Sequence, residues 1–161
     1  EIGLILNDHN SNKISSSAIR ENLKSGKFEL ANKDLERNFS VAGKVIKGDQ
    51  RGRTIGIPTA NLEYPLNTIT IPYGVYAVET IIEGNTYFGI VNFGIRPTFN
   101  KDKPIVEAYL FDFDNDIYDK DIEILFHKQI RQEKKFNDIK ELLNQINIDI
   151  AEAKKILKYG N

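Results

Sequence analysis

The 161-residue sequence contains no cysteine, which excludes disulfide bonds and thiolate metal sites. Its 22 Lys and Arg residues nearly balance 23 Asp and Glu residues, so no overall positive field attracts a nucleic-acid backbone. No apolar run reaches membrane-spanning length, and no charged-then-apolar leader is typical of a signal peptide. The remaining composition, 40% hydrophobic and 28% charged residues, is that of a globular domain. We therefore expect a cytoplasmic protein that binds neither nucleic acid nor membrane.

Hydrophobic periodicity divides the chain into three regions. Residues 15–37 have helical spacing with a break at Ser25-Gly26, which predicts two short helices. Residues 39–130 contain short strand-like runs separated by turns, of which Glu83-Gly84-Asn85 and Asp114-Asn115-Asp116 are the clearest hairpin turns. This pattern predicts an antiparallel sheet that closes into a small barrel. From Asn137, which we expect to cap the helix start, the apolar residues return to helical spacing. A long amphipathic helix is therefore expected to cover the barrel.

The segment GDQRGRTIGIPTAN, residues 48–61, joins the first expected strand to the next. Its three glycines allow positive φ angles and a close approach of backbone N–H groups to an anion, while Arg51 and Arg53 supply positive charge. No Gly-Lys-Ser/Thr sequence ends the segment and no helix is expected after it, so it is not a P-loop. Two interpretations remain at this level, a phosphate-binding loop and an ordinary turn.

Hard oxygen ligands occur at the end of this segment. Thr59 and Asn61 lie two residues apart in an extended stretch, so their side-chain oxygens share one side of the chain and suit magnesium together with phosphate oxygens. Glu107 is a candidate base for phosphoryl transfer, because strand alternation places it on one face with Tyr109 and Phe111. The alternative is that this face is the half-exposed outer surface, where Glu107 is simply solvated.

The segment RQEKKF lies between the last expected strand and the long helix. Its residues Arg131, Glu133 and Phe136 either line a pocket for a flat ring or form the polar start of the helix with one packing residue. The residues alone leave both interpretations open.

Five motifs follow one another in a particular order: GRTIGIPTAN, YGVYAV, VNFGIRPT, VEAYLFDFDNDIY and IRQEKKF. In this order and spacing, residues 38–158 resemble the riboflavin kinase family, and specifically the kinase module of bacterial bifunctional riboflavin kinase/FAD synthetases. The resemblance implies a mainly β fold, a six-stranded antiparallel closed barrel with a long C-terminal helix, in residues 38–161. It also implies that riboflavin and ATP, with Mg²⁺, are converted to FMN and ADP.

The resemblance assigns roles to individual residues. Glu107 is implied as the catalytic base, and Thr59 and Asn61 are implied as magnesium ligands that take part in catalysis. Contacts to ATP are implied for Gly48, Gly52, Arg53, Thr54, Gly56 and Pro58, and adenine-side contacts for the hairpin from Phe111 to Tyr118. Contacts to riboflavin or FMN are implied for Asn92, Arg96, Pro97, Thr98, Arg131, Glu133 and Phe136.

Two positions depart from the family's usual pattern. Ile57 stands where phenylalanine is usual, which keeps an apolar side chain before Pro58. Asp119 stands where glycine is usual, in a turn beside the expected adenine site, and this makes nucleotide affinity the property most open to change. A flavin-binding barrel without turnover and an OB-like nucleic-acid-binding barrel are the alternatives to a kinase.

The segment ISSSAIR, residues 14–20, resembles part of the adenylyltransferase module of the same bifunctional enzymes, with Ser17 where threonine is usual. The sequence begins at Glu1 without an initiator methionine. We therefore expect residues 1–37 to be the C-terminal remnant of an FMN adenylyltransferase module. On this interpretation FAD is made only by a longer protein, for which self-association is left open.

Overall fold

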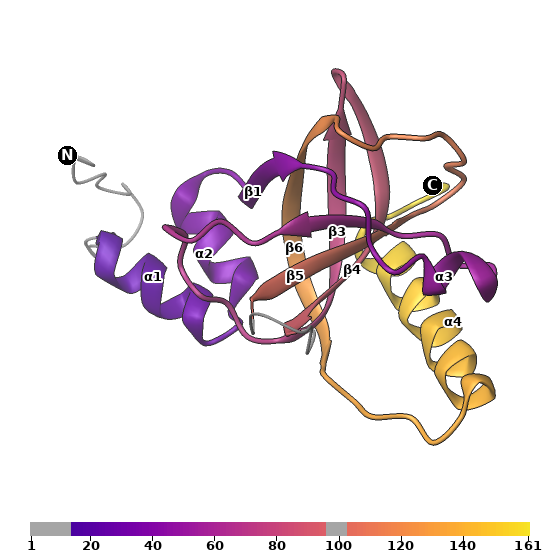
Figure 1. Ribbon diagram of the computed structural model, residues 1–161. Coiled ribbons are helices and arrows are strands. Elements are labelled where there is room, and N and C mark those ends of the chain that lie inside the picture. Colours follow the sequence, from indigo (N-terminus) through magenta and orange to yellow (C-terminus); the bar gives the residue numbers. More distant parts are fainter. Residues whose placement is uncertain (1–13, 96–102) are drawn as a thin grey trace.

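The chain, described by a computed structural model over residues 14–95 and 103–161, forms a curved β-sheet flanked by helices (Figure 1). The strands are β1 (Phe39–Lys44), β2 (Ala60–Glu63), β3 (Gly74–Ile82), β4 (Asn85–Ile95), β5 (Pro104–Leu110) and β6 (Asp121–Gln132). The helices are α1 (Ser16–Lys24), α2 (Phe28–Leu35), α3 (Arg51–Thr54) and α4 (Ile139–Ile156). The mainly β content, the two short helices before β1 and the long C-terminal helix confirm the corresponding predictions.

The six strands form one sheet in the order β1-β6-β3-β4-β5-β2, and each pairing is antiparallel. The edge strands are β1 and β2. Between these edges, the described part of the chain has one isolated bridge, from Ile46 just after β1 to Asn61 in β2. The six-stranded antiparallel half-barrel is thus confirmed, whereas the closed barrel stays a prediction, because one bridge is not a continuous ladder.

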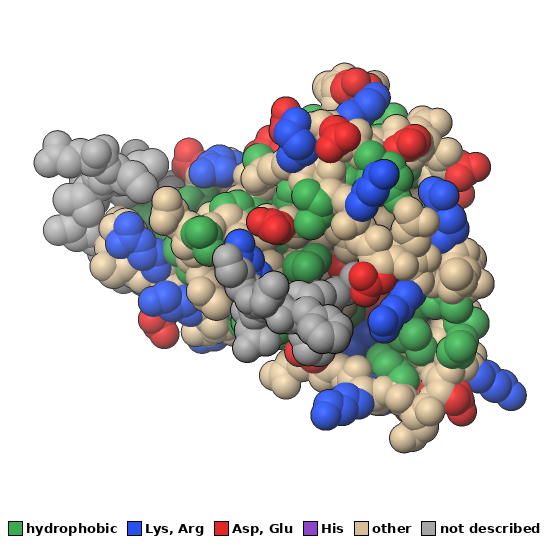
Figure 2. Space-filling view, viewed as in Figure 1, with side chains coloured by type: hydrophobic (Ala, Val, Ile, Leu, Met, Phe, Trp, Pro, Cys, Tyr) green, Lys and Arg blue, Asp and Glu red, His purple; other side chains and the backbone are tan. Residues whose placement is uncertain are grey.

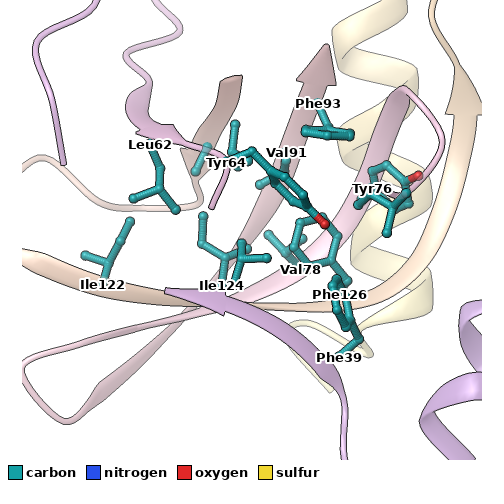
Figure 3. Close-up of a cluster of buried hydrophobic side chains, with 14 of the residues drawn as sticks. Phe39, Leu62, Tyr64, Tyr76, Val78, Val91, Phe93, Ile122, Ile124 and Phe126 are labelled. Atoms are coloured by element: carbon teal, nitrogen blue, oxygen red, sulfur yellow. The ribbon is translucent and has the colours of Figure 1, made fainter. Parts of the chain in front are cut away.

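The inner face of the sheet carries the main hydrophobic core, which is shown in Figure 3. Its most deeply buried members on the strands, all at most 1% exposed, are Leu62, Tyr76, Val78, Val91, Phe93, Val106, Ala108, Ile124 and Phe126. Because side chains alternate along a strand, Glu107 and Tyr109 of β5 point to the opposite face. There a second apolar cluster holds α4 against the sheet, and it contains Val75, Ala77, Ile90, Phe111, Ala153 and Leu157.

Helix α2 is part of the main core. Phe28 is 1% exposed and its ring packs 5.1 Å from that of Tyr76 and 5.9 Å from that of Phe126. The Nδ2 group of Asn32 donates to the Phe126 carbonyl, and its Oδ1 accepts from the Phe39 N–H, each at 2.8 Å. The predicted boundary at residues 37 and 38 therefore does not separate two cores. The assignment of residues 1–37 to another module stays a prediction.

Because Phe28 fills space within the sheet's core, Phe28→Ala is expected to lower the free energy of unfolding by about 3–5 kcal/mol. Leu30→Ala is the matched control, since Leu30 lies on the same helix and is 52% exposed. Urea or thermal unfolding of both variants measures the difference. Equal stabilities of the two variants would show that the α2 helix packs on the barrel without supporting it.

The start of α4 corrects one expectation. The helix is capped by Asp138, whose Oδ1 accepts from the Glu141 N–H at 2.8 Å, and not by Asn137. The Asn137 N–H instead donates to Glu141 Oε2 at 3.0 Å, and this hydrogen bond lowers the pKa of Glu141. Two reciprocal hydrogen bonds thus fix the path of the chain into α4.

The molecular surface bears on the expected partners. In Figure 2, Lys and Arg side chains are intermixed with Asp and Glu side chains over the face in view. No helix within residues 14–95 and 103–161 has both the length and the apolar character needed to cross a membrane. That the chain binds no nucleic acid stays a prediction.

Candidate active site

Predicted site residues from separate strands form one row across the sheet. Strand pairing places Asn61 of β2 opposite Glu107 of β5, and Glu107 opposite Asn92 of β4. The row continues from Asn92 to Val75 of β3, and from Val75 to Arg131 of β6. Directly paired residues of an antiparallel sheet carry their side chains on the same face. The fold therefore brings together four predicted residues that are up to 70 positions apart in the sequence, from Asn61 to Arg131.

A cavity of about 520 Å³, here called the first cavity, lies over this row. Its walls come from the outer face of the sheet, the loop carrying α3, the segment 133–136 and helix α4, and the last of these lies on the same side of the sheet as α3 (Figure 1). The predicted residues in these walls are Gly52, Thr59, Asn92, Glu107, Arg131, Glu133 and Phe136. Glu107 is thus on the outer face of the sheet, as in the solvated alternative, but the loop and α4 cover that face and leave Glu107 half-buried.

The segment RQEKKF lines the first cavity, which favours the pocket interpretation over a merely polar helix start. The Arg131 guanidinium lies 5.6 Å from the centre of the Phe136 ring, and Lys134 Nζ lies 5.4 Å from it. The Glu133 carboxylate packs against Gly94, because a Cβ at Gly94 would lie 2.0 Å from Glu133 Oε1. Aromatic, cationic and anionic groups thus share one wall of the cavity.

The glycines of the 48–61 segment have different reasons for lacking a side chain. Gly56 has the positive φ that the sequence suggested, at 79°. Gly52 instead allows a close backbone approach, because its Cβ would lie 2.1 Å from the Ile57 carbonyl oxygen. Likewise, a Cβ at Gly48 would lie 2.2 Å from Asn61 Nδ2. The segment also contains the short helix α3, which the sequence did not predict.

The side-chain oxygen of Asn61 is suited to bind a cation. Asn61 is 4% exposed, and its Oδ1 has no hydrogen-bond partner among the residues that the structure describes. Leaving a buried acceptor unsatisfied costs free energy, so this oxygen suits a bound cation. Asn61 is covered by Gly48 and lines neither cavity, whereas Thr59 does line the first. These neutral oxygens therefore fit a magnesium ion that also takes phosphate oxygens.

Gly48→Ala is expected to lower turnover about tenfold, because the added methyl group would push the Asn61 amide away from its position. Lys47→Ala is the control, since Lys47 precedes Gly48 in the same segment and its side chain is exposed. Steady-state rates of both folded variants test this prediction. Equal rates would show that the absence of a side chain at Gly48 is not needed for turnover.

A second cavity, of about 280 Å³, lies on the other side of the 48–61 segment. The predicted residues Arg53, Pro58, Thr59 and Tyr118 line it, together with Phe113, Asp114, Asn115 and Asp116 of the β5–β6 connection. Among the residues lining either cavity, Thr59 alone lines both. The two cavities therefore meet at a predicted catalytic residue.

Phe111 does not line the second cavity, although the resemblance implied a nucleotide contact there. It is 5% exposed and packs 5.4 Å from the Tyr159 ring beneath the C-terminal end of α4. The left-handed φ of 53° at Asp112 ends the strand alternation, and Phe113 turns into the cavity wall against Tyr87. The resemblance implied adenine-side contacts for the hairpin from Phe111 to Tyr118, which includes Phe113. The turn at Asp112 reverses the face on which the residues after Phe111 lie, so Phe113 and not Phe111 reaches the cavity.

The departure at Asp119 keeps the backbone conformation that glycine favours. Asp119 has a φ of 64°, in the left-handed region that Asp tolerates better than most residues. Its N–H donates to the Val45 carbonyl at 3.0 Å, and its carbonyl accepts from Lys44 Nζ at 3.0 Å. The turn is therefore retained despite the substitution. Ile57, the other departure, lines the first cavity with its apolar side chain.

The remaining predicted residues lie in two kinds of place. Gly48, Thr54 and Gly56 line neither cavity, and Thr54 Oγ1 donates to the Arg51 carbonyl at 2.7 Å. Arg96, Pro97 and Thr98 lie outside the described residues.

Sequence reasoning missed Asp149 of α4, which lines the first cavity and is fully buried. Its only sequence signal is an acid among the apolar positions of the helix.

Comparison with known proteins covers nearly all of the chain. Residues 35–157 match the model of the riboflavin kinase family. The bifunctional riboflavin kinase/FMN adenylyltransferase of Bacillus subtilis (strain 168) is 48% identical over 144 residues, which are 88% of this chain and 46% of that protein. The protein of the same name from Escherichia coli (strain K12) is 39% identical over 145 residues, which are 89% and 46% of the two chains. The chain thus spans about half the length of the curated relatives it matches.

Solved structures share the fold. A crystal structure of a macrolide-efflux protein from Streptococcus pneumoniae superposes with a TM-score of 0.83 at 32% identity, covering 94% of this chain and 49% of that one. The riboflavin kinase of Trypanosoma brucei superposes with a TM-score of 0.54 at 20% identity, covering 75% and 80% of the two chains, and supports the fold alone.

The fold, the two cavities that share Thr59 and these relatives define an enzyme of the kinase class. The chain belongs to the riboflavin kinase family. The predicted family, the kinase activity and the phosphorylation of riboflavin to FMN are thereby confirmed at the level of this domain.

Proposed function

We propose that the row Asn61, Glu107 and Asn92 is where this riboflavin kinase domain transfers a phosphoryl group from ATP to the ribityl 5′-hydroxyl of riboflavin. The observation that carries the proposal is the direct strand pairing of these three residues beside a cavity of about 520 Å³. Cavities of this size accommodate ligands the size of a flavin. The products are FMN and ADP.

Riboflavin is assigned to the first cavity and the ATP phosphates to the boundary between the cavities. The apolar side chains Val75, Ile90 and Tyr109 form a floor suited to a flat ring system, and Phe136 lies in a wall. Thr59 lines both cavities, so a phosphoryl group beside it is within reach of ligands on either side. Holding both reactants in this geometry supplies a large part of the rate enhancement.

Glu107 is assigned the role of general base. It is half-buried, and its Oε2 accepts from Asn92 Nδ2 at 3.5 Å, a long hydrogen bond that orients the carboxylate along the row. In this position Glu107 would accept the proton of the ribityl 5′-hydroxyl as the oxygen attacks phosphorus. Catalytic hydrogen bonds often tighten only when substrate is bound, so the length does not argue against the role.

Thr59 and Asn61 would hold magnesium, which supplies charge neutralisation on the transferring phosphoryl group when it is bound. Because Gly48 covers Asn61, the 48–50 segment must shift for Asn61 Oδ1 to reach a ligand. The Ile46–Asn61 bridge keeps the backbone of Asn61 in place during such a shift, and it supports the finer proposal that the sheet closes into a barrel here.

Riboflavin-dependent ADP release from MgATP by the purified chain tests the proposed function. FMN should appear in equal amount, and chelation of divalent cations should stop the reaction. Binding of riboflavin without release of ADP would instead identify a flavin-binding domain without turnover, and absence of both would reject a flavin site.

We also propose that the whole protein adenylylates FMN to FAD, as the names of its relatives state for those proteins. The 161-residue chain spans only 46% of the Bacillus subtilis protein, and it is expected to make FMN but no FAD. Chromatography of a reaction containing FMN and ATP measures this, and any FAD formed would contradict the expectation. A cytoplasmic location and self-association of the whole protein stay predictions.

A further inference from the structure

Asp149 is an acidic residue on the sheet-facing side of α4. It is fully buried, and its neighbours one turn before and after it, Ile146 and Ala153, pack in the apolar cluster between helix and sheet. A charged side chain thus lies among apolar ones. Burying a carboxylate costs several kcal/mol unless it is paired and hydrogen-bonded. Replacing a buried ion pair by apolar side chains commonly leaves stability unchanged or improved, so an acid at this place calls for a reason other than stability.

The partner of Asp149 is Arg131, at the end of the row of site residues. Arg131 Nε donates to Asp149 Oδ1 at 3.0 Å and to Oδ2 at 2.9 Å, and Arg131 Nη2 lies 2.9 Å from Oδ2. Gln145 Nε2 donates to Oδ1 at 3.0 Å. Both carboxylate oxygens are therefore engaged, and a pair with this fork geometry restricts rotation of the guanidinium plane.

The other side of the same guanidinium meets the first cavity. Its carbon lies 5.6 Å from the centre of the Phe136 ring, within the range of a cation–π contact. Arg131, Phe136 and Asp149 all line the cavity, and the Arg131 side chain is 20% exposed. The orientation of Arg131 in this wall thus depends on a buried carboxylate that pairs with it.

We propose that Asp149 is a positioning residue for riboflavin, which holds Arg131 against Phe136 so that the pair forms a fixed wall for the flat isoalloxazine ring. The proposal rests on the proposed function, since it assumes that the flavin occupies the first cavity. Asp149 acts through Arg131, and Gln145 supports it by fixing Oδ1. The competing explanation is that the ion pair only holds α4 on the sheet.

Asp149→Asn tests the proposal, because asparagine has nearly the same size but cannot pair with Arg131 as an anion. The dissociation constant for riboflavin, measured by flavin fluorescence, is expected to rise about tenfold or more. The KM for MgATP should change less than about twofold, because Asp149 lies away from the second cavity. Glu152→Gln is the matched control, since Glu152 lies on the same helix and pairs with Lys155 at an exposed position.

A double-mutant cycle shows whether Asp149 acts through Arg131. In an Arg131→Met background, Asp149→Asn is expected to have no further effect on riboflavin affinity. Equal effects of Asp149→Asn in both backgrounds, or wild-type riboflavin affinity in the folded single variant, would overturn the proposal. Wild-type ADP release is measured alongside, so that failure of the proposed function is seen separately.

If Asp149→Asn does not fold, a second variant tests the proposal. Arg131→Met with Asp149→Leu removes both charges together, a change that commonly leaves stability unaffected or improved. If this variant folds and binds riboflavin as weakly as Arg131→Met, the ion pair contributes to riboflavin binding beyond holding α4 on the sheet. If it folds and binds riboflavin as tightly as the wild type, the pair has only a structural role.

Discussion

Replacing Glu107 with glutamine is expected to lower the turnover number about 10²- to 10⁴-fold, the usual contribution of a positioned general base. Glutamine keeps the size of the side chain and an oxygen that can accept from Asn92 Nδ2, but it cannot take the proton of the ribityl hydroxyl. Dissociation constants for riboflavin and MgATP should therefore change little. Turnover and both affinities are to be measured on the same folded preparation.

Glu63→Gln is the matched control for this experiment, because Glu63 lies on the adjacent strand β2 and is exposed. Its turnover should equal that of the wild type. A loss of less than about threefold in Glu107→Gln would show that the carboxylate is solvated and takes no part in proton transfer.

Replacing Asn61 with alanine is expected to lower turnover about 10²- to 10³-fold, as observed when one preorganised group that stabilises transition-state charge is removed. MgATP should also bind more weakly, and more magnesium should be needed for half-maximal rate. Folding should persist, because the Asn61 Oδ1 has no hydrogen-bond partner to lose among the described residues and the backbone bond from Ile46 N–H to Asn61 remains.

Asn144→Ala controls for the loss of an amide side chain, since Asn144 is exposed on α4. Its turnover, magnesium dependence and melting temperature should all match the wild type. A folded Asn61→Ala protein with wild-type rate and MgATP affinity would show that the oxygen is buried for a structural reason and that the magnesium site lies elsewhere.

Local interactions were sufficient for the sequence to predict helices α1, α2 and α4 and the β3–β4 turn. The other expected hairpin turn, at residues 114–116, lies instead within a longer connection between β5 and β6. The break between α1 and α2 occurs at Ser25 and Gly26, where Gly26 adopts a φ of 75° that other residues disfavour. The β3–β4 turn falls on Glu83 and Gly84, which both have positive φ, as a tight hairpin requires. Alternation likewise placed Glu107 and Tyr109 on one face of their strand, although it did not decide whether that face is the outer one. Each of these follows from neighbouring residues alone.

Short elements that are held by distant partners could not be predicted from the sequence. Strand β2 has four residues and is defined by its pairing with β5, while α3 has four residues and no buried side chain. Neither length supports a recognisable periodicity. The turn at Asp112, which separates the environments of Phe111 and Phe113, likewise depends on how the β5–β6 connection packs.

The sequence by itself thus determined which residues are chemically suited to phosphoryl transfer, since oxygen ligands, a carboxylate and a glycine-rich segment are properties of residue type and local spacing. Only the tertiary structure decided that Asn61, Glu107 and Asn92 are neighbours, because strand order and register join positions far apart in the chain. It also decided that Asp149 of α4 forms an ion pair with Arg131 of β6. The physical reason is that pairing and burial are set by the whole core, and no short window of sequence contains them.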